Sequence, residues 1–108
     1  MNEQELALQL QSLLDYHYDN KVMVEMIEGG LLPVIQLVCE ENIVNLFLIK
    51  GARNMENALL NISQLATDSG WVVNKWGGFY NELYSILYQY YIEGTNDQDI
   101  QGTLRFKS

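Results

Sequence analysis

Residues 79–92, FYNELYSILYQYYI, carry more apolar surface than one side of a helix can bury. On a helical wheel, one contiguous apolar arc contains Phe79, Leu83, Ile86, Leu87 and Tyr90. The other tyrosines of the stretch widen this arc to roughly 200°, whereas a surface helix that packs on one side needs about 100°. We therefore expect a helix whose aliphatic half faces its own domain and whose tyrosine half faces another chain.

Tyrosine combines a large apolar ring with a hydroxyl group that hydrogen-bonds to water, so it suits a surface that is covered at some times and wet at others. Five of the seven tyrosines of the chain lie in this stretch. The predicted partner-binding residues are Tyr80, Tyr84, Tyr88 and Tyr91. At the level of sequence this face has three possible roles: a dimer interface, a site for a foreign partner, or packing against the chain's own sheet.

Three short segments upstream predict an antiparallel β-meander. They are residues 22–28 (VMVEMIE), 31–39 (LLPVIQLVC) and 43–50 (IVNLFLIK), and the links between them are too short for parallel crossovers. Gly29 and Gly30 supply the positive-φ residues of a tight first hairpin. Apolar residues occur on both faces of the predicted sheet, so we expect both faces to be at least partly covered.

Helices are predicted before and after the strands in the sequence. Asn2 and Glu5 match a capping box at the start of a helix over residues 3–17, in which leucines recur on one face. A second apolar stripe predicts a helix over residues 54–69, with Asn54 as its N-cap and a glycine after its last turn.

The predicted fold is α+β, a three-stranded antiparallel meander with flanking helices in the order α-β-β-β-α-(β)-α. The bracketed strand is residues 71–74 (WVVN), which also fit the lead-in to the last helix. Residues 1–94 are expected to form a single compact α+β domain. Residues 95–108 are expected to form a polar C-terminal tail that adds an edge strand or is disordered.

Charge and cysteine content exclude several classes of function. Fourteen acidic and six basic residues give a formal net charge of −8. We therefore expect no direct binding to nucleic acid and no binding to an anionic membrane. Residues 1–10 have no positively charged start and no unbroken apolar core, so we expect no signal peptide there. No apolar run approaches the ~18 residues of a membrane span. The single cysteine cannot form an internal disulfide, so a cytoplasmic location is expected.

The chain contains no recognisable catalytic, cofactor or metal motif, so we expect no enzyme activity and no cofactor. Cys39 shares a strand face with Ile35 and Leu37, and its acidic neighbours disfavour the thiolate, which predicts a buried structural thiol. His17 is the only histidine and ends an apolar helical stripe, which favours a partly buried, hydrogen-bonded side chain over a metal ligand.

Two weaker motifs also favour structural explanations. Asp97, Asp99 and Gly102 match the opening of an EF-hand loop, but its twelfth position is Ser108 instead of a bidentate glutamate. We therefore expect no calcium site there. Residues 50–53 (KGAR) precede a helix but lack the glycine spacing of a phosphate-binding loop, so we expect an ordinary strand-to-helix turn.

These features predict a non-catalytic protein-binding module of the chaperone, immunity or inhibitor type. We expect a homodimer that binds a protein with a basic surface through the aromatic helix face and the acidic surface. The element order, a helix then three strands then a helix, resembles that of the class I type III secretion chaperones. The alternative is an acidic nucleic-acid mimic that inhibits a DNA- or RNA-binding enzyme, of the anti-restriction or anti-CRISPR type. The net charge favours this alternative, whereas the dispersed carboxylates do not.

Overall fold

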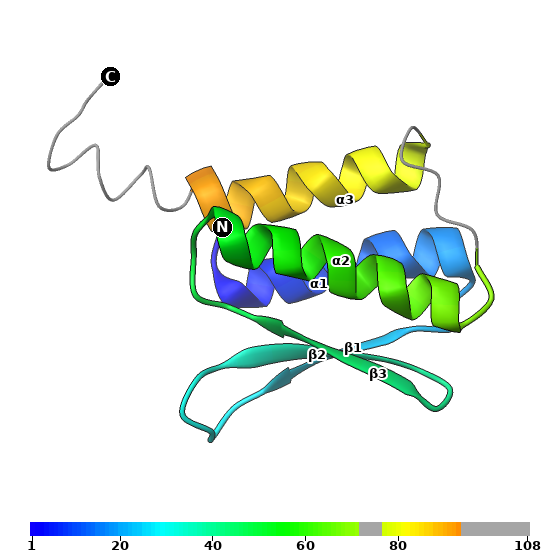
Figure 1. Ribbon diagram of the computed structural model, residues 1–108, viewed down its shortest axis with the longest axis horizontal. Helices are drawn as coiled ribbons and strands as arrows, with labels where there is room; N and C mark the ends of the chain where they lie inside the picture. The colour runs from blue at the N-terminus through cyan, green and yellow to red at the C-terminus, as the bar shows by residue number, and fades with distance from the viewer. Residues whose placement is uncertain (72–76, 94–108) are drawn as a thin grey trace, which may run out of the picture.

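Three layers make up the protein (Figure 1). The structure is a computed structural model that describes residues 1–71 and 77–93. A three-stranded antiparallel sheet forms the first layer, with β1 (Met23–Ile27), β2 (Val34–Cys39) and β3 (Asn42–Phe47) in that spatial order. The helices α1 (Glu3–Tyr18) and α2 (Ala52–Asp68) pack on β1 and β3. The third layer is α3 (Gly78–Tyr88), continued by the π-helical turn η1 (Gln89–Glu93).

The predicted α+β fold with a three-stranded antiparallel meander is confirmed by this arrangement. The element order is α-β-β-β-α-α. Trp71 itself is not in a strand, and the rest of the predicted fourth strand lies outside the described residues, as does the predicted tail over residues 95–108.

The first helix forms as the sequence predicts. The Asn2 side chain accepts a hydrogen bond from the Glu5 backbone N–H, and the Glu5 carboxylate accepts one from the Asn2 N–H, each at 2.8 Å. This reciprocal pair satisfies two backbone N–H groups at the helix start. The helix ends where Asp19 adopts a left-handed conformation with φ of 55°.

The strands are shorter than predicted at the first hairpin. The second strand begins at Val34 instead of residue 31, and Leu31 is fully exposed in the loop before it. Pro33 explains the difference, because it has no N–H group to contribute to a strand ladder. Glu40 and Glu41 form the second hairpin turn, closed by the pairing of Cys39 with Asn42.

The second helix begins earlier than predicted, and the assignment of Asn54 as its N-cap was wrong. Gly51 occupies the N-cap position with φ of 125°, and no side chain caps the helix there. The Asn54 side chain instead donates a hydrogen bond to the Ile49 carbonyl at 2.8 Å. At the other end the predicted glycine stop is confirmed: Gly70 has φ of 85°, and the Trp71 N–H donates to the Ala66 carbonyl.

Among the described residues, helices cover only one face of the sheet. This corrects the expectation that both faces are at least partly covered. Ile35, Leu37 and Leu46 point toward the helices and are 0 to 1% exposed. On the opposite face, Met23 and Phe47 are 57% and 50% exposed. The reason is that α3 packs on α1 and α2, on the side away from the sheet, so that no described helix remains for the outer face.

Side chains from the helices bind backbone groups along both outer strands. On β3, Asn61 of α2 donates to the Asn45 carbonyl at 2.9 Å, and the Tyr91 hydroxyl of η1 donates to the Phe47 carbonyl. On the β1 side, Gln11 of α1 binds the Val24 N–H. The helical layer is therefore fixed to the sheet by directional bonds as well as by apolar packing.

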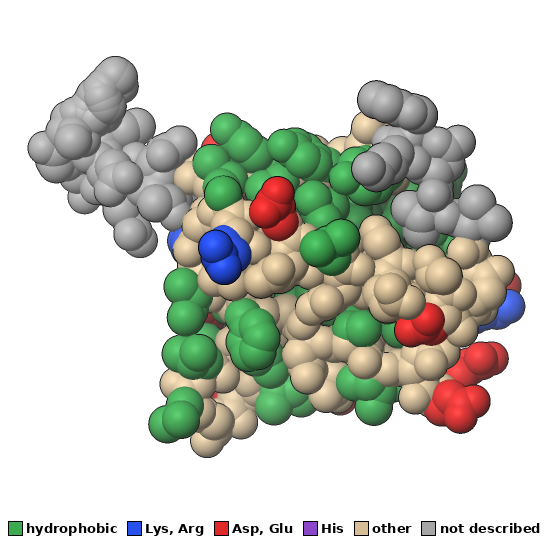
Figure 2. Space-filling model, in the orientation of Figure 1, with side chains coloured by type: hydrophobic (Ala, Val, Ile, Leu, Met, Phe, Trp, Pro, Cys, Tyr) green, Lys and Arg blue, Asp and Glu red, His purple; other side chains and the backbone are tan. Residues whose placement is uncertain are grey.

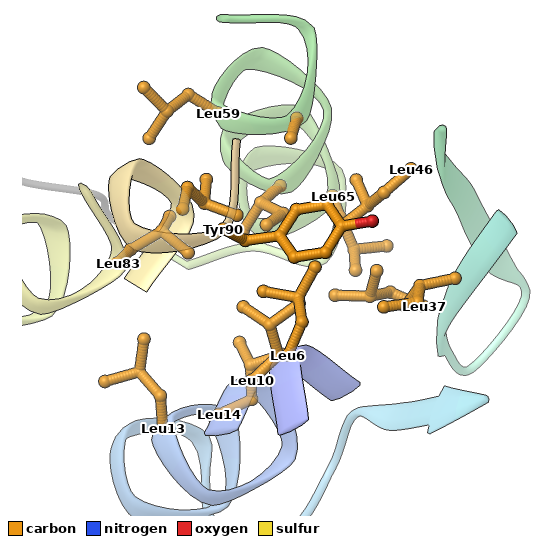
Figure 3. Close-up of a cluster of buried hydrophobic side chains, with 14 of the residues drawn as sticks. Leu6, Leu10, Leu13, Leu14, Leu37, Leu46, Leu59, Leu65, Leu83 and Tyr90 are labelled. Carbon is orange, nitrogen blue, oxygen red and sulfur yellow. The ribbon is translucent and has the colours of Figure 1, made fainter. Parts of the chain in front are cut away.

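Tyr90 joins all three layers at the centre of the core (Figure 3). Its ring extends from η1 between leucines of α1 and α2, including Leu6 and Leu65. Its hydroxyl group donates to the Leu48 carbonyl, just after β3, at 2.8 Å. This buried phenol therefore aligns the end of the third helix with the edge of the sheet.

Candidate protein-binding groove

A groove of about 630 Å³ lies between α2 and α3. Its α2 wall is lined by Ala52, Met55, Glu56, Leu59, Leu60 and Ser63, and its α3 wall by Tyr80, Tyr84, Tyr88 and Ile92. The apolar side chains of Met55 and Leu59, which are only 5% and 8% exposed, form its floor. The upper part of the molecule, along α3 and its border with α2, presents mainly hydrophobic side chains (Figure 2).

Three of the four predicted partner-binding tyrosines line this groove together. Tyr80, Tyr84 and Tyr88 are spaced four residues apart, which places them on one side of the α-helix. The rings of Tyr84 and Tyr88 are stacked, with centroids 6.2 Å apart and planes 20° apart. These two side chains are 45% and 39% exposed, so the chain itself covers them only in part.

The fourth predicted residue, Tyr91, lies in the core and does not line the groove. The helix changes from α to π at Gln89, and the wider i→i+5 turn brings two consecutive side chains, Tyr90 and Tyr91, to the inner side. A wheel of 3.6 residues per turn instead places Tyr91 between Tyr80 and Tyr84. The predicted tyrosine face therefore divides into a groove part and a buried residue.

The α2 wall of the groove was missed by the sequence analysis. Leu60 is 67% exposed and projects beside the buried Leu59. The sequence did contain a sign of this wall, because Leu60 is a large apolar residue that lies outside the apolar stripe that α2 buries. Glu56 is the one charged residue that lines the groove within the described part of the chain.

A second, smaller hollow lies on the other side of α3, against α1. Leu8 and Tyr16 line it and are 68% and 84% exposed. Beside it, the His17 Nε2 atom lies 2.9 Å from the Glu82 carboxylate, linking the end of α1 to the first part of α3. The expected partly buried, hydrogen-bonded histidine is thereby confirmed.

The other candidate positions have structural roles in the described residues. Cys39 is 2% exposed, in agreement with the predicted buried thiol. The Lys50 ammonium lies 4.5 Å from the centroid of the Tyr90 ring, and the Gly51 N–H donates to the Tyr91 carbonyl at 2.9 Å. The turn over residues 50–53 is thus bound to η1. The EF-hand-like segment lies outside the described residues.

Burial raises the pKa of three tyrosines, none of which lines the groove. The pKa of Tyr90 rises to about 12, first because burial removes water from the hydroxyl group and second because Glu3 contributes negative charge. Burial likewise raises the pKa of Tyr91 and of Tyr18 above the usual value for tyrosine. These shifts keep the buried hydroxyl groups protonated and are a property of the core.

Within residues 1–71 and 77–93, no cluster of three histidine, cysteine or acidic side chains is placed to hold a metal ion. No helix in the same residues has the length and apolarity needed to cross a membrane. Comparisons of the chain with protein-family models, with curated proteins and with solved structures give no match.

Proposed function

We propose that this protein is a non-catalytic binding module whose α2/α3 groove holds an amphipathic helix of a partner protein with a basic surface. The observation that carries the proposal is the ladder of Tyr80, Tyr84 and Tyr88 beside an apolar floor. Secretion chaperones, immunity proteins and inhibitors are the kinds of protein that act in this way.

The dimensions of the groove suit a helix. Tyr80 and Tyr88 are eight residues apart, which corresponds to about 12 Å along an α-helix, or a little over two turns. A partner helix that enters a groove uses apolar anchors at i, i+3 or i+4, and i+7, over a similar length. Tyrosine is favoured at such interfaces because its ring is large and rigid while its hydroxyl group still bonds to water before the partner arrives.

The charge distribution favours a basic partner. The chain has a net charge of −8, and Glu56 lies at the groove itself. Glu82 and Glu93 are further exposed acidic residues on α3 and η1. Such a surface raises the association rate with a cationic protein, and added salt lowers that rate by screening.

A direct test uses two helical peptides of about 14 residues, or about 21 Å of helix, each held helical by a side-chain staple. Both carry leucine at the anchor positions; one has lysine and arginine on its flanks, and the other has glutamate. Fluorescence anisotropy at low salt should show saturable binding of the basic peptide. Tyr84→Glu together with Tyr88→Glu should weaken this binding at least about tenfold.

Tyr16→Glu is the matched control, because Tyr16 is an exposed tyrosine on α1 that lies outside the groove. This variant should bind the basic peptide like the wild type. No saturable binding of the basic peptide, or equal weakening by Tyr16→Glu and the groove variant, overturns the proposal. Equal affinity for the acidic and basic peptides rejects the basic character of the partner.

A further inference from the structure

We propose that the open face of the sheet joins two copies of this chain into a homodimer, stacked sheet on sheet with the two-fold axis along β2. This interface is separate from the α2/α3 groove, which lies in the helical layers on the other side of the molecule. The dimer expected from the sequence is thus assigned to the sheet, and the tyrosine groove is left for the partner.

The strand register divides the open face into two apolar rows and one polar row between them. The pairing across the three strands aligns each row perpendicular to the strands. The first apolar row is Met23, Val38 and Ile43; the second is Ile27, Val34 and Phe47; the polar row is Glu25, Gln36 and Asn45. Met23, Ile43 and Phe47 are at least half exposed. A sheet face that meets water permanently is usually polar at these positions.

The polar row favours a second copy of this chain over a helix as the molecule that covers the open sheet face. A two-fold axis along β2 exchanges β1 with β3, so Glu25 of each copy faces Asn45 of the other, and Gln36 faces its own equivalent. Each carboxylate then meets an amide donor, and each apolar row meets its own counterpart. Within each copy the Gln36 amide donates to the Asn45 side-chain oxygen at 3.3 Å, which leaves the Asn45 amide nitrogen to donate to the other copy. An apolar helix laid along β2 would instead cover the Glu25 carboxylate, and burying a carboxylate without a donor is costly.

The side chains also match the shape of stacked sheets. The central strand carries the smaller Val34 and Val38, and the outer strands carry Met23, Ile43 and Phe47. Stacked sheets lie about 10 Å apart, and the small side chains of the central strand allow the two faces to approach along the axis.

The size of the face sets the strength of the dimer. Three strands of five or six residues, about 4.8 Å apart with a rise of about 3.3 Å per residue, span a flat area of roughly 250 Å² per copy. Two such faces total roughly 500 Å², below the about 1,000 Å² that a specific, stable interface buries. We therefore expect a weak dimer, with a dissociation constant on the order of hundreds of micromolar.

The test is sedimentation velocity from about 10 µM to about 1 mM protein, a range that brackets dissociation at hundreds of micromolar. The wild type should change from monomer to dimer. Ile43→Lys should stay monomeric and folded, because this side chain is already 56% exposed in the monomer. Leu8→Lys, at an exposed leucine of α1, is the matched control and should dimerise like the wild type.

A charge exchange tests the proposed axis. Asn45→Asp places two carboxylates opposite each other and should weaken the dimer at least about tenfold. Adding Glu25→Lys to this variant restores an attractive pair across the interface and should restore dimerisation. Such a rescue cannot come from loss of folding.

Three outcomes overturn the proposal: a monomeric wild type at every concentration, dissociation by Leu8→Lys as well as by Ile43→Lys, or a dimer that dissociates only in Tyr84→Glu plus Tyr88→Glu. The third outcome places the interface at the groove. The two proposals fail separately, because Ile43→Lys should leave peptide binding unchanged and Tyr84→Glu plus Tyr88→Glu should leave dimerisation unchanged.

Discussion

Gln11 shows how a single amide group can replace a missing strand. Its Nε2 donates to the Val22 carbonyl at 2.8 Å, and its Oε1 accepts from the Val24 N–H at 2.9 Å. The same Nε2 also donates to the Asp15 carboxylate at 2.8 Å. The side chain therefore binds the edge of the first strand in the way that a neighbouring backbone would, and it connects α1 to the sheet.

Truncating this side chain should destabilise the protein clearly. Gln11→Ala leaves an N–H and a carbonyl group without their partners in a partly buried position, so we expect a loss of about 1–3 kcal/mol in the free energy of unfolding. Gln9→Ala, at an exposed position two residues earlier, should stay within about 0.5 kcal/mol of the wild type. Urea unfolding followed by circular dichroism measures both, and equal losses contradict the role of Gln11.

The buried phenols make stability sensitive to alkali. The pKa of Tyr90 is raised from 10.0 to about 12 by burial and by Glu3, and the pKa of Tyr91 is raised as well. A pKa that is higher in the folded state favours the protonated form, so this contribution to stability is complete below pH 10 and is lost as the pH rises toward about 12. Tyrosinate absorbance should show a late-ionising group that Tyr90→Phe removes; unchanged late ionisation in that variant contradicts the assignment.

At the scale of the elements, α2 places a core residue next to a residue that is exposed on the groove wall. Leu59 is 8% exposed and contributes to the core, whereas its neighbour Leu60 is 67% exposed on the groove wall. The helical rotation of about 100° per residue points these two neighbouring leucines in different directions, one into the core and one toward the groove.

Alanine at Leu59 should therefore mainly lower the stability of the fold, whereas alanine at Leu60 should mainly weaken peptide binding. Leu59→Ala should lower the free energy of unfolding by about 2–5 kcal/mol, the range for a buried leucine. Leu60→Ala should change it by less than about 0.5 kcal/mol but should weaken binding of the basic peptide by more than about fivefold. Urea unfolding and anisotropy titration test the pair, and a large stability loss at Leu60 rejects its assignment to the groove wall.

The sequence was informative at several positions where local chemistry decides structure, but the predicted tight hairpin at Gly29 and Gly30 was wrong, because only Gly29 has a positive φ and the loop runs over residues 28–33. Asn2 and Glu5 identify the first helix start, and the apolar runs identify the three strands. Sequence reasoning was less successful where tertiary contacts decide. Tyr91 was misplaced because its hydroxyl bonds to the Phe47 carbonyl through a π turn that has no recognised sequence signal. Asn54 was misassigned because it bonds backward to Ile49.

Coverage of the sheet also depends on tertiary packing. Apolar patterning correctly indicated that both faces carry hydrophobic residues, but it does not say which helix packs on which layer. Tyr90 and Tyr91 bind the Leu48 and Phe47 carbonyls from the side of α1 and α2, so α3 is held on top of those helices. One apolar sheet face therefore stays open in the described structure.

At the scale of the whole molecule, the net charge should have opposite effects on folding stability and on the proposed binding of a basic partner. A net charge of −8 on a chain of 108 residues repels itself, and salt screens this repulsion. Raising NaCl from about 20 mM to about 500 mM should therefore raise the urea midpoint while it weakens binding of the basic peptide. A midpoint that falls with salt contradicts the dominance of self-repulsion, and salt-independent binding contradicts electrostatic attraction of the partner.

The helix side chains that hydrogen-bond to the outer strands also bear on how the protein can polymerise. Gln11 binds one outer strand, and Asn61 and Tyr91 bind the other, so four backbone groups on the two edges of the sheet are already engaged. Amyloid-like growth proceeds by adding strands at such edges, without end. The proposed stacking through the open sheet face would stop at two copies, because the described residues present one such face. If two copies stack as proposed, their association ends in a finite assembly instead of a fibril.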